Sequence, residues 1–447
     1  MKAELLKIAE SVVIQAVEGE QVEVVAVHGK ETEVRVYQGE IESFTAAESQ
    51  GVGIRIVHDG RQGMAYAGSL DVDVLAETLE EARDNASFGT PDEFQAIANP
   101  DGVESVSLEL LDPSLSEFAN EEKIAMAIDL ERSILASDTR IIGVESTDYV
   151  DSINTSAIVT STGIRRASQE GGCYIAASSL ASDGVDTQTG FGYSVGRSPT
   201  SLDVVKASSD ATERATRLLG AKKADSGRMT VILDPYVTAQ FLGIIGSTLS
   251  GEALLKGRSL FADRDGDQVA PSFLTLIDDP TDVDAFTATE ADGEGLASRR
   301  NVLIDQGCLN GFLHNSYTAR ALGKSSTGSA VRSYNSSPGA GPLALTLTPG
   351  RCSQSELIQQ VGEGMLIQGV AGLHSGVNPV SGDFSAGAEG LMIREGCLAE
   401  PVREITIAST LQRMLLDIQT IGNDLERLPM KSSGVSIVVD DIMVSGV

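Results

Sequence analysis

The residues whose side chains could bind a metal or transfer a proton are few and widely spaced. The chain has four histidines, and they are His28, His58, His314 and His374. Zinc takes three or four His, Cys or carboxylate ligands, and a compact site usually starts from two ligands about one helical turn apart. No two histidines have that spacing. We expect His28 and His58, which adjoin strand ends and turns, to be hydrogen-bonded or solvated, whereas His314 and His374 could face a cleft.

A further candidate is Glu252, a carboxylate near the end of a predicted helix. Lys256 follows it by four residues, the spacing at which a glutamate and a lysine meet on one face of a helix. A general base needs an acidified water or another proton donor beside it. We therefore expect Glu252 to be solvated or paired with Lys256 rather than catalytic.

Two short motifs resemble ligand-binding loops and are incomplete. The segment Gly323-Lys324-Ser325 is similar to the end of a phosphate-binding loop, but Thr318 stands where its first glycine belongs. Asp263, Asp265 and Asp267 are spaced as in a calcium loop, yet Leu274 occupies the position of the closing glutamate. Both patterns favour solvated loops.

The elements that would position these side chains alternate between helices and short strands. In the first part, apolar residues at helical spacing predict helices over residues 2–16 and 71–86. Between them, short β-rich runs with polar punctuation predict an antiparallel meander over 22–27, 33–37, 41–46, 52–57 and 63–66. A second block predicts a helix starting near Asn120, strands paired as hairpins over 140–150 with 152–161 and 172–182 with 187–196, and a helix over 201–219.

A polar stretch over 221–227 marks the main domain boundary. After it, a strand over 230–233 leads to Asp234 and Pro235, an N-cap followed by proline at the first helical position, and the helix is predicted to run to about residue 255. The rest is rich in glycine and β-branched residues, with one further helix over 409–421. The sequence predicts an α+β fold: helix-covered antiparallel meander sheets over 1–222, divisible near 108/109, then a barrel- or sandwich-like β domain over 223–447.

Composition limits the functional classes. The formal charge of −31 would repel nucleic acid, and no apolar run approaches the ~20 residues that span a bilayer. The first residues lack the apolar segment of a secretory signal, and four cysteines form no CxxC pair. We expect a cytoplasmic protein without disulfides that binds neither DNA nor membranes directly.

Several segments together resemble the TldD/PmbA family from end to end. They are Gly51–Arg55, Asp59–Gly63, Ser250–Ser259, Asp292–Gly295, Ser316–Arg320, Ser326–Gly328, Asn378–Ser385, Gly396–Val402 and Gly422–Leu425. Each segment is a weak signal alone, whereas their order and spacing together are specific. The resemblance implies one of two subunit types that pair around an enclosed cavity to form a protease.

The resemblance also implies which type this chain is. One type binds zinc through an HExxxH helix and a cysteine near its C-terminus; the other, TldE or PmbA, lacks these ligands. On this sequence the two histidine positions are Gly251 and Lys256, the glutamate position is Glu252, and no cysteine follows Gly422–Leu425. Glycine has no donor and an ammonium repels a divalent cation, so we expect no metal in this chain and zinc in the partner.

The resemblance therefore implies a PmbA/TldE-type subunit that acts on peptides or unfolded proteins with a zinc-bearing TldD-type partner, as a heterodimer, or alternatively pairs with itself. Extended substrate could add to exposed strand edges. Within the glycine-rich stretch 372–390, the candidates for contact with substrate or partner are His374, Asn378, Asp383 and Phe384. Two alternatives stay open: a non-enzymatic homodimer that regulates other proteins, as in the family's description as a modulator of DNA gyrase, and an independent peptidase with another site.

Overall fold

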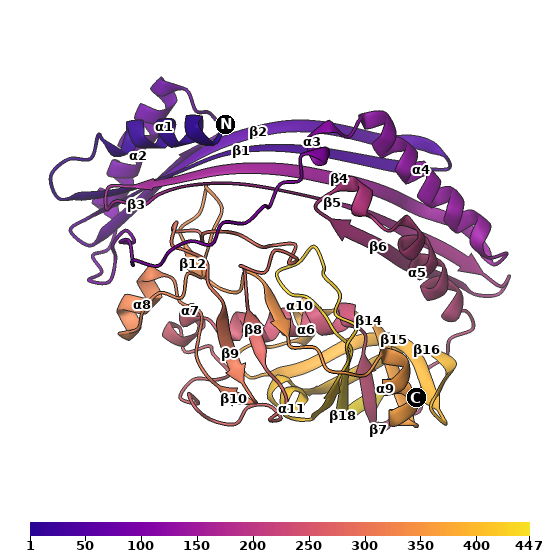
Figure 1. Ribbon diagram of the computed structural model, residues 1–447. Coiled ribbons are helices and arrows are strands. Elements are labelled where there is room, and N and C mark those ends of the chain that lie inside the picture. Colours follow the sequence, from indigo (N-terminus) through magenta and orange to yellow (C-terminus); the bar gives the residue numbers. More distant parts are fainter.

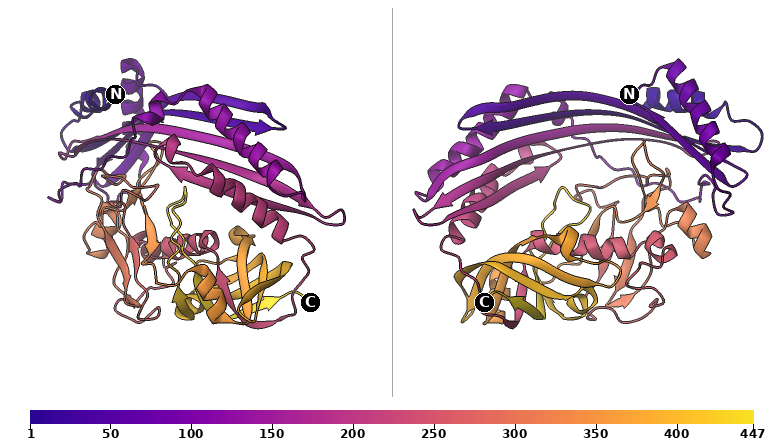
Figure 2. Two further views of the ribbon diagram at one scale, coloured as in Figure 1. Left: turned by 45° about the vertical axis from the view of Figure 1, so that its right-hand side comes forward. Right: turned by 180° about the vertical axis from the view of Figure 1, so that it is seen from behind.

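The computed structural model describes residues 1–447, which form a long arched sheet above a compact C-terminal β barrel (Figures 1 and 2). The arched sheet is antiparallel, with strand order β3-β2-β1-β4-β5-β6. Its strands are β1 (Glu20–Tyr37), β2 (Glu40–His58), β3 (Arg61–Ala67), β4 (Ile141–Thr160), β5 (Arg165–Ser182) and β6 (Thr187–Gly196). The predicted α+β class, with an antiparallel meander followed by a β-rich C-terminal part, is confirmed.

The strands are longer than the sequence predicts. Runs 22–27 and 33–37 are one strand, β1; 41–46 and 52–57 are one strand, β2; and 140–150 does not form a hairpin with 152–161, because both belong to β4. The polar residues read as turns lie inside these strands: Lys30 and Glu31 keep their pairing with both β2 and β4 while their side chains are exposed. At these two positions the polar residues mark exposure to solvent rather than a turn, whereas Asp151, between 150 and 152, is buried and paired with Lys123.

Helices cover one face of the sheet, which we call the outer face. Helices α1 (Lys2–Val13) and α2 (Val72–Phe88) bury Val22, Val24 and Ala26 of β1 in one core. Helices α4 (Asn120–Ser137) and α5 (Val204–Arg217) bury Val34 and Val36 of the same strand in a second core. Since these residues all have even numbers on one strand, all four helices lie on the same side. The opposite, inner face looks onto the C-terminal part (Figure 1).

The chain between α2 and α4 passes beneath the sheet before it reaches the short helix α3 (Ser114–Glu117). We call residues 98–112 the strap. Gly171 of β5 donates its N–H to the carbonyl of Leu110 at 2.8 Å, and Arg299 of the C-terminal part pairs with Asp101 at 2.6 Å. The strap is thereby fixed to both parts of the molecule.

The C-terminal part is built on a closed barrel. Its strands are β7 (Gly227–Leu233), β14 (Gly364–Ala371), β15 (Asp383–Arg394), β16 (Cys397–Thr410) and β18 (Ile437–Ser445), with β17 (Ile418–Ile421) beside β18. Pairing of β16 with β18 closes the ring. A core of 39 buried residues fills the space between the barrel, α6 (Pro235–Thr248) and the adjoining loops.

Two predicted helices are shorter than expected. Asp234 caps α6 through the N–H of Tyr236 as predicted, but the helix ends at Thr248, and a separate short helix, α7 (Gly251–Leu255), follows. The break forms because Gly251 donates its N–H to Leu313 at 2.7 Å instead of continuing the helix. The run 409–421 forms α11 (Leu411–Leu416) and then β17, because Ile418–Ile421 pair with the open edge of β18.

The remaining elements are small. A four-stranded sheet contains β8 (Leu276–Asp278), β9 (Asn301–Asp305), β10 (Cys308–Leu309) and β13 (Leu345–Leu347), and a two-stranded ladder contains β11 (Ala330–Val331) and β12 (Gly339–Ala340). The short helices are α8 (Ser316–Leu322), α9 (Gln354–Val361) and α10 (Leu373–Gly376). No helix is long and apolar enough to cross a membrane. The division into domains over 1–222, with two halves meeting near 108/109, and 223–447 stays a prediction.

Candidate functional site

The segment with the spacing of a metalloprotease helix is α7. Ser250 accepts the N–H of Ala253 and so begins the helix, and Gly251 is buried at its first turn. The Lys256 ammonium forms an ion pair with the Glu252 carboxylate, as the four-residue spacing predicts. Both side chains are about half exposed, at 55% and 44%. The carboxylate at the glutamate position of the motif is thus held by a surface ion pair.

A histidine far away in the sequence fills the space beside Gly251. A Cβ atom built on Gly251 would overlap Nδ1 of His314 and lie 2.7 Å from Oγ1 of Thr318. His314 is only 5% exposed, and its Nδ1 is 3.3 Å from Oγ1 of Thr318. Burial, and to a lesser degree Lys324, lowers the pKa of His314, so the imidazole is neutral near pH 7.

These residues do not fit a zinc ion. Gly251 brings no donor, Lys256 is a cation already paired with Glu252, and a side chain at position 251 has no room because His314 occupies it. No group of three or more His, Cys, Asp or Glu residues in the chain is placed to hold a metal. The donor set around α7 therefore provides neither a zinc site nor a metal-bound water for Glu252 to deprotonate.

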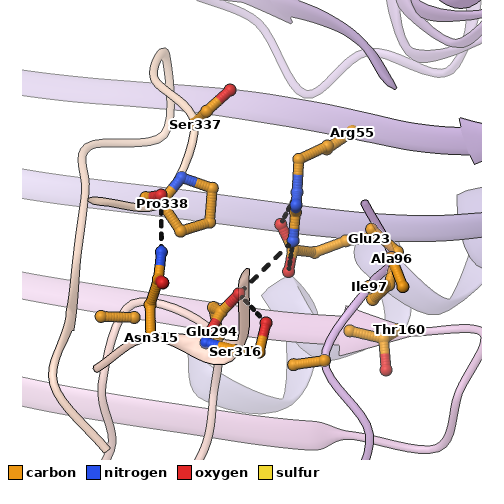
Figure 3. A network of polar contacts seen from close by, with 12 residues as sticks. Glu23, Arg55, Ala96, Ile97, Thr160, Glu294, Asn315, Ser316, Ser337 and Pro338 are labelled. Atoms are coloured by element: carbon orange, nitrogen blue, oxygen red, sulfur yellow. Dashed lines mark hydrogen bonds and ion pairs between the residues drawn. The ribbon is translucent and has the colours of Figure 1, made fainter. Parts of the chain in front are cut away.

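A buried polar network joins the sheet to the C-terminal part just beyond this segment (Figure 3). Arg55 of β2 donates to both carboxylate oxygens of Glu23 on β1, at 2.9 and 3.0 Å, and lies 3.8 Å from Glu294. Arg332 also pairs with Oε1 of Glu23, the oxygen that accepts from Nε of Arg55. Glu294 in turn accepts the N–H and hydroxyl of Ser316 at the start of α8, at 2.8 and 2.5 Å.

The charges in this network compensate one another. Burial alone would raise the pKa of Glu23, but Arg55 and Arg332 lower it below the ordinary value. Each of the four charged side chains is at most 3% exposed. Because an unpaired buried charge is costly, the network fixes the position of the C-terminal part against the sheet.

The loop after β11 reinforces this contact. A Cβ atom on Gly53 of β2 would overlap the carbonyl of Tyr334, and one on Gly51 would overlap its ring. The absence of side chains at these two positions lets the loop lie directly on the strand. Arg332 and Tyr334 are thereby placed at the edge of the space between the two parts.

That space is a cavity of about 920 Å³, within the size range of ligand pockets. Its roof is the inner face of β1, β4 and β5, and its remaining walls are the strap, the loop over residues 286–293 and the loop after β11. The loop between β17 and β18, yellow in Figure 1, rises from the barrel towards the sheet and brings Lys431 to the same cavity.

The four candidates from the glycine-rich stretch lie elsewhere, at one end of the barrel. His374 is exposed on α10, and Asn378 accepts the N–H groups of Val380 and Ser381 in the turn before β15. Asp383 accepts the hydroxyl of Ser381, and Phe384 is 4% exposed in the main core. None of the four lines the cavity. Their contact with a substrate or partner stays a prediction.

Comparison with known proteins identifies the family. Sequence profiles of three domains of the PmbA/TldA metallopeptidases match this chain: domain 1 over residues 22–86, the central domain over 113–219 and the C-terminal domain over 226–446. The chain belongs to the PmbA/TldA metallopeptidase family. The predicted resemblance to TldD/PmbA proteins is therefore confirmed.

Relatives of this family match nearly the whole chain. Metalloprotease PmbA from Escherichia coli O157:H7 is 26% identical over 91% of this chain and 88% of its own. The crystal structure of a protein from Thermotoga maritima, named as a proposed modulator of a DNA gyrase, superposes with a TM-score of 0.89 at 26% identity over 99% of each chain. TldE from Thermococcus kodakarensis shares the fold, with a TM-score of 0.89 at 21% identity and 99% coverage of each chain.

The sequence gives partial signals for the residues that the structure brings together. Glu294 and Ser316 lie in segments that carry the family resemblance, so their importance is detectable, although their contact is not. Arg55 also lies in such a segment, whereas Glu23 and Arg332 do not. The pairing of these three residues is not detectable, because they come from two strands and a distant loop. The only sequence signal for buried charges is that Glu23 and Arg55 interrupt the otherwise apolar runs of β1 and β2.

Proposed function

We propose that this chain is the PmbA/TldE-type subunit of a two-component cytoplasmic metalloprotease that degrades or processes peptides and unfolded proteins. In this proposal it forms part of the proteolytic chamber and leaves zinc chemistry to its partner. The observation that carries the proposal is the packing of His314 against Gly251, which leaves no room for a ligand at the first histidine position. The ion pair of Lys256 with Glu252 removes the second position as well.

The proposed partner is a zinc-bearing TldD-type subunit in a heterodimer. The absence of cysteine after Gly422–Leu425 supports this assignment, because the third family ligand is missing too. The cavity beneath the sheet and the exposed strand edges suit an extended, unfolded substrate. The four unpaired cysteines are consistent with the cytoplasm.

The test is reconstitution. The purified chain should contain far less than one zinc per molecule by elemental mass spectrometry and should not cleave unfolded casein. Mixing it with a TldD-type subunit from the same organism should yield proteolysis that a chelator abolishes. Stoichiometric zinc together with proteolysis by the isolated chain would contradict the proposal.

The alternative function is a non-enzymatic homodimer that binds or regulates other proteins. The name of the Thermotoga relative favours it. This alternative predicts that no TldD-type subunit restores proteolysis, whereas a gyrase subunit co-purifies with the tagged chain. Sedimentation of the isolated chain distinguishes a monomer awaiting its partner from a preformed homodimer.

A further inference from the structure

The cavity beneath the sheet is basic in a strongly acidic protein. The chain has a formal charge of −31, yet five Lys or Arg residues line the cavity, although the guanidinium of one, Arg165, is directed to Glu10 of the outer-face helix α1. Three acidic residues, Glu170, Glu290 and Asp292, accompany them. Burial raises the pKa of Glu170, and burial together with Glu294 raises the pKa of Asp292. Both shifts weaken the negative charge of the cavity wall. A cleft lined by positive charges raises the local concentration of negatively charged ligands.

Two of the basic side chains have neither an ion-pair partner nor a hydrogen-bond acceptor within the chain. Arg165 pairs with Glu10 of α1, and Arg197 donates to backbone carbonyls that include Gly171 and Ala285. Arg166 and Lys431, in contrast, form no salt bridge. Arg166 belongs to the row of inner-face residues, because it lies opposite Ile158 of β4, which in turn lies opposite Val25 of β1.

Two buried polar atoms of the cavity wall also lack partners. Arg332 is 2% exposed, and its Nη2 has no hydrogen-bond acceptor although the other end of the guanidinium pairs with Glu23. Oγ of Ser105 on the strap is buried without a partner as well. Both residues line the cavity. A buried donor without an acceptor costs free energy, but solvent does not reach either atom, so a ligand in the cavity contacts them only if the wall shifts.

The backbone of β5 supplies the fourth observation. Strand β6 pairs only with Cys173–Ser182 of β5, so residues 165–172 form an open strand edge. The N–H and carbonyl of Gly171 point away from β4, since they bond to Leu110 and Arg197. Alternate residues share that direction. The N–H and carbonyl groups of Ala167 and Gln169 therefore point outwards, and they make no bond to the loops.

We propose that this cavity binds an acidic peptide in extended conformation. Its backbone pairs with Ala167 and Gln169 of β5, and its carboxylates bind Arg166 and Lys431. The inference rests on the proposed function and adds the substrate class: segments of unfolded protein rich in Asp or Glu. Recognition takes place in this chain and needs no zinc-bearing partner.

The experiment is calorimetric titration of the full-length chain, without partner, with three acetylated and amidated hexapeptides. The peptides alternate alanine with glutamate, glutamine or lysine, so that they differ only in side-chain charge. The glutamate peptide should bind at least about tenfold more tightly than the glutamine peptide, and the lysine peptide should not bind. Equal binding of all three, or no binding of the glutamate peptide, would overturn the proposal.

Variants locate the site. R166Q/K431Q should weaken the glutamate peptide about tenfold or more and leave the glutamine peptide unchanged. R165Q is the matched control, because it removes the neighbouring arginine, whose charge is already paired with Glu10. A167P removes only the outward N–H of an edge strand, a position that tolerates proline, and should weaken both peptides. Equal effects of R165Q and R166Q/K431Q, with unchanged melting temperatures, would overturn the assignment.

The outcome separates this inference from the proposed function. If the isolated chain binds no acidic peptide while the reconstituted complex still cleaves casein, the cavity assignment fails and the subunit role survives. If the chain binds the glutamate peptide but no partner yields proteolysis, the subunit role fails and the cavity assignment survives.

Discussion

At the residue scale, the decisive pair is Gly251 and His314. The i,i+4 pairing of Glu252 with Lys256 is predictable from sequence because it is local to one helix. The packing of His314 beside Gly251 is not predictable from sequence, because His314 lies in a loop some sixty positions later. The bridge between Ser250 and Leu313 brings it to Gly251. The sequence predicts that zinc ligands are missing at α7, and the structure shows that His314 fills the space beside Gly251.

This packing predicts that Gly251→Ala destabilises the protein by on the order of 1–3 kcal/mol, the usual cost of inserting a methyl group into a packed site. Gly251→Ala/His314→Ala should recover part of the loss, because the second change opens the space that the methyl group needs. Urea unfolding of the single and double variants measures the coupling.

Gly311→Ala is the control for this series, because nothing lies within 4 Å of a Cβ at that position. Additive effects of the Gly251 and His314 changes would show that the two residues do not compete for space. The same competition predicts that Gly251→His/Lys256→His does not restore zinc binding.

At the element scale, helix positions and the antiparallel meander were largely predictable, whereas strand length was not. The period-two pattern of β1 and β4 is interrupted by polar residues, which are indistinguishable in sequence from turn residues. In the structure those residues remain paired, because β1 has a hydrogen-bonded neighbour on both sides. The barrel was predictable only as a β-rich part, since its closure depends on the contact between β16 and β18.

Because β2 is much longer than β3, part of its outer edge has no neighbouring strand. Strand β3 pairs only with Val52–His58, so Glu40–Gly51 form an open edge that exposes Ile41 at 46% and Phe44 at 41%. Charged residues on an edge discourage strand addition by another molecule. The glutamates at positions 40 and 42 have that effect here.

Glu40→Thr/Glu42→Thr should therefore increase self-association, which sedimentation velocity over a range of concentrations would detect. Glu31→Thr/Glu33→Thr is matched to it in charge and residue type, but changes β1, which is paired on both edges. The control variant should sediment like the wild type. Identical sedimentation of the two variants would show that edge protection is not the role of these glutamates.

At the scale of the whole molecule, two structural parts with separate cores meet through a small number of buried charges. The sheet carries its own helix-covered cores, and the barrel has another. Glu23 is the centre of their contact, because Arg55 and Arg332 both depend on it. The stability of the arrangement, and with it the shape of the cavity, should depend strongly on this carboxylate.

Glu23→Gln leaves buried Arg332 without an anionic partner and Arg55 with only the more distant Glu294, and should cost about 3–5 kcal/mol. We expect calorimetry to show the sheet and the barrel unfolding in clearly separated transitions in this variant, compared with closer transitions in the wild type. Glu48→Gln changes an exposed carboxylate on the same sheet, 59% accessible, and should shift the melting temperature little. A single unchanged transition in Glu23→Gln would contradict the role given to the network.

The pairing of β1 with β4 also bears on how the chain folds. Val36 lies opposite Thr147 and Glu23 opposite Thr160, so the centre of the arched sheet joins segments that are distant in the chain. Hairpins β1–β2 and β4–β5 can form locally, but loop closure between them must precede any contact across the centre. Such high contact order slows folding. Before β4 pairs with β1, the second edge of β1 is open. A partly folded chain with such an unpaired strand edge is prone to aggregation.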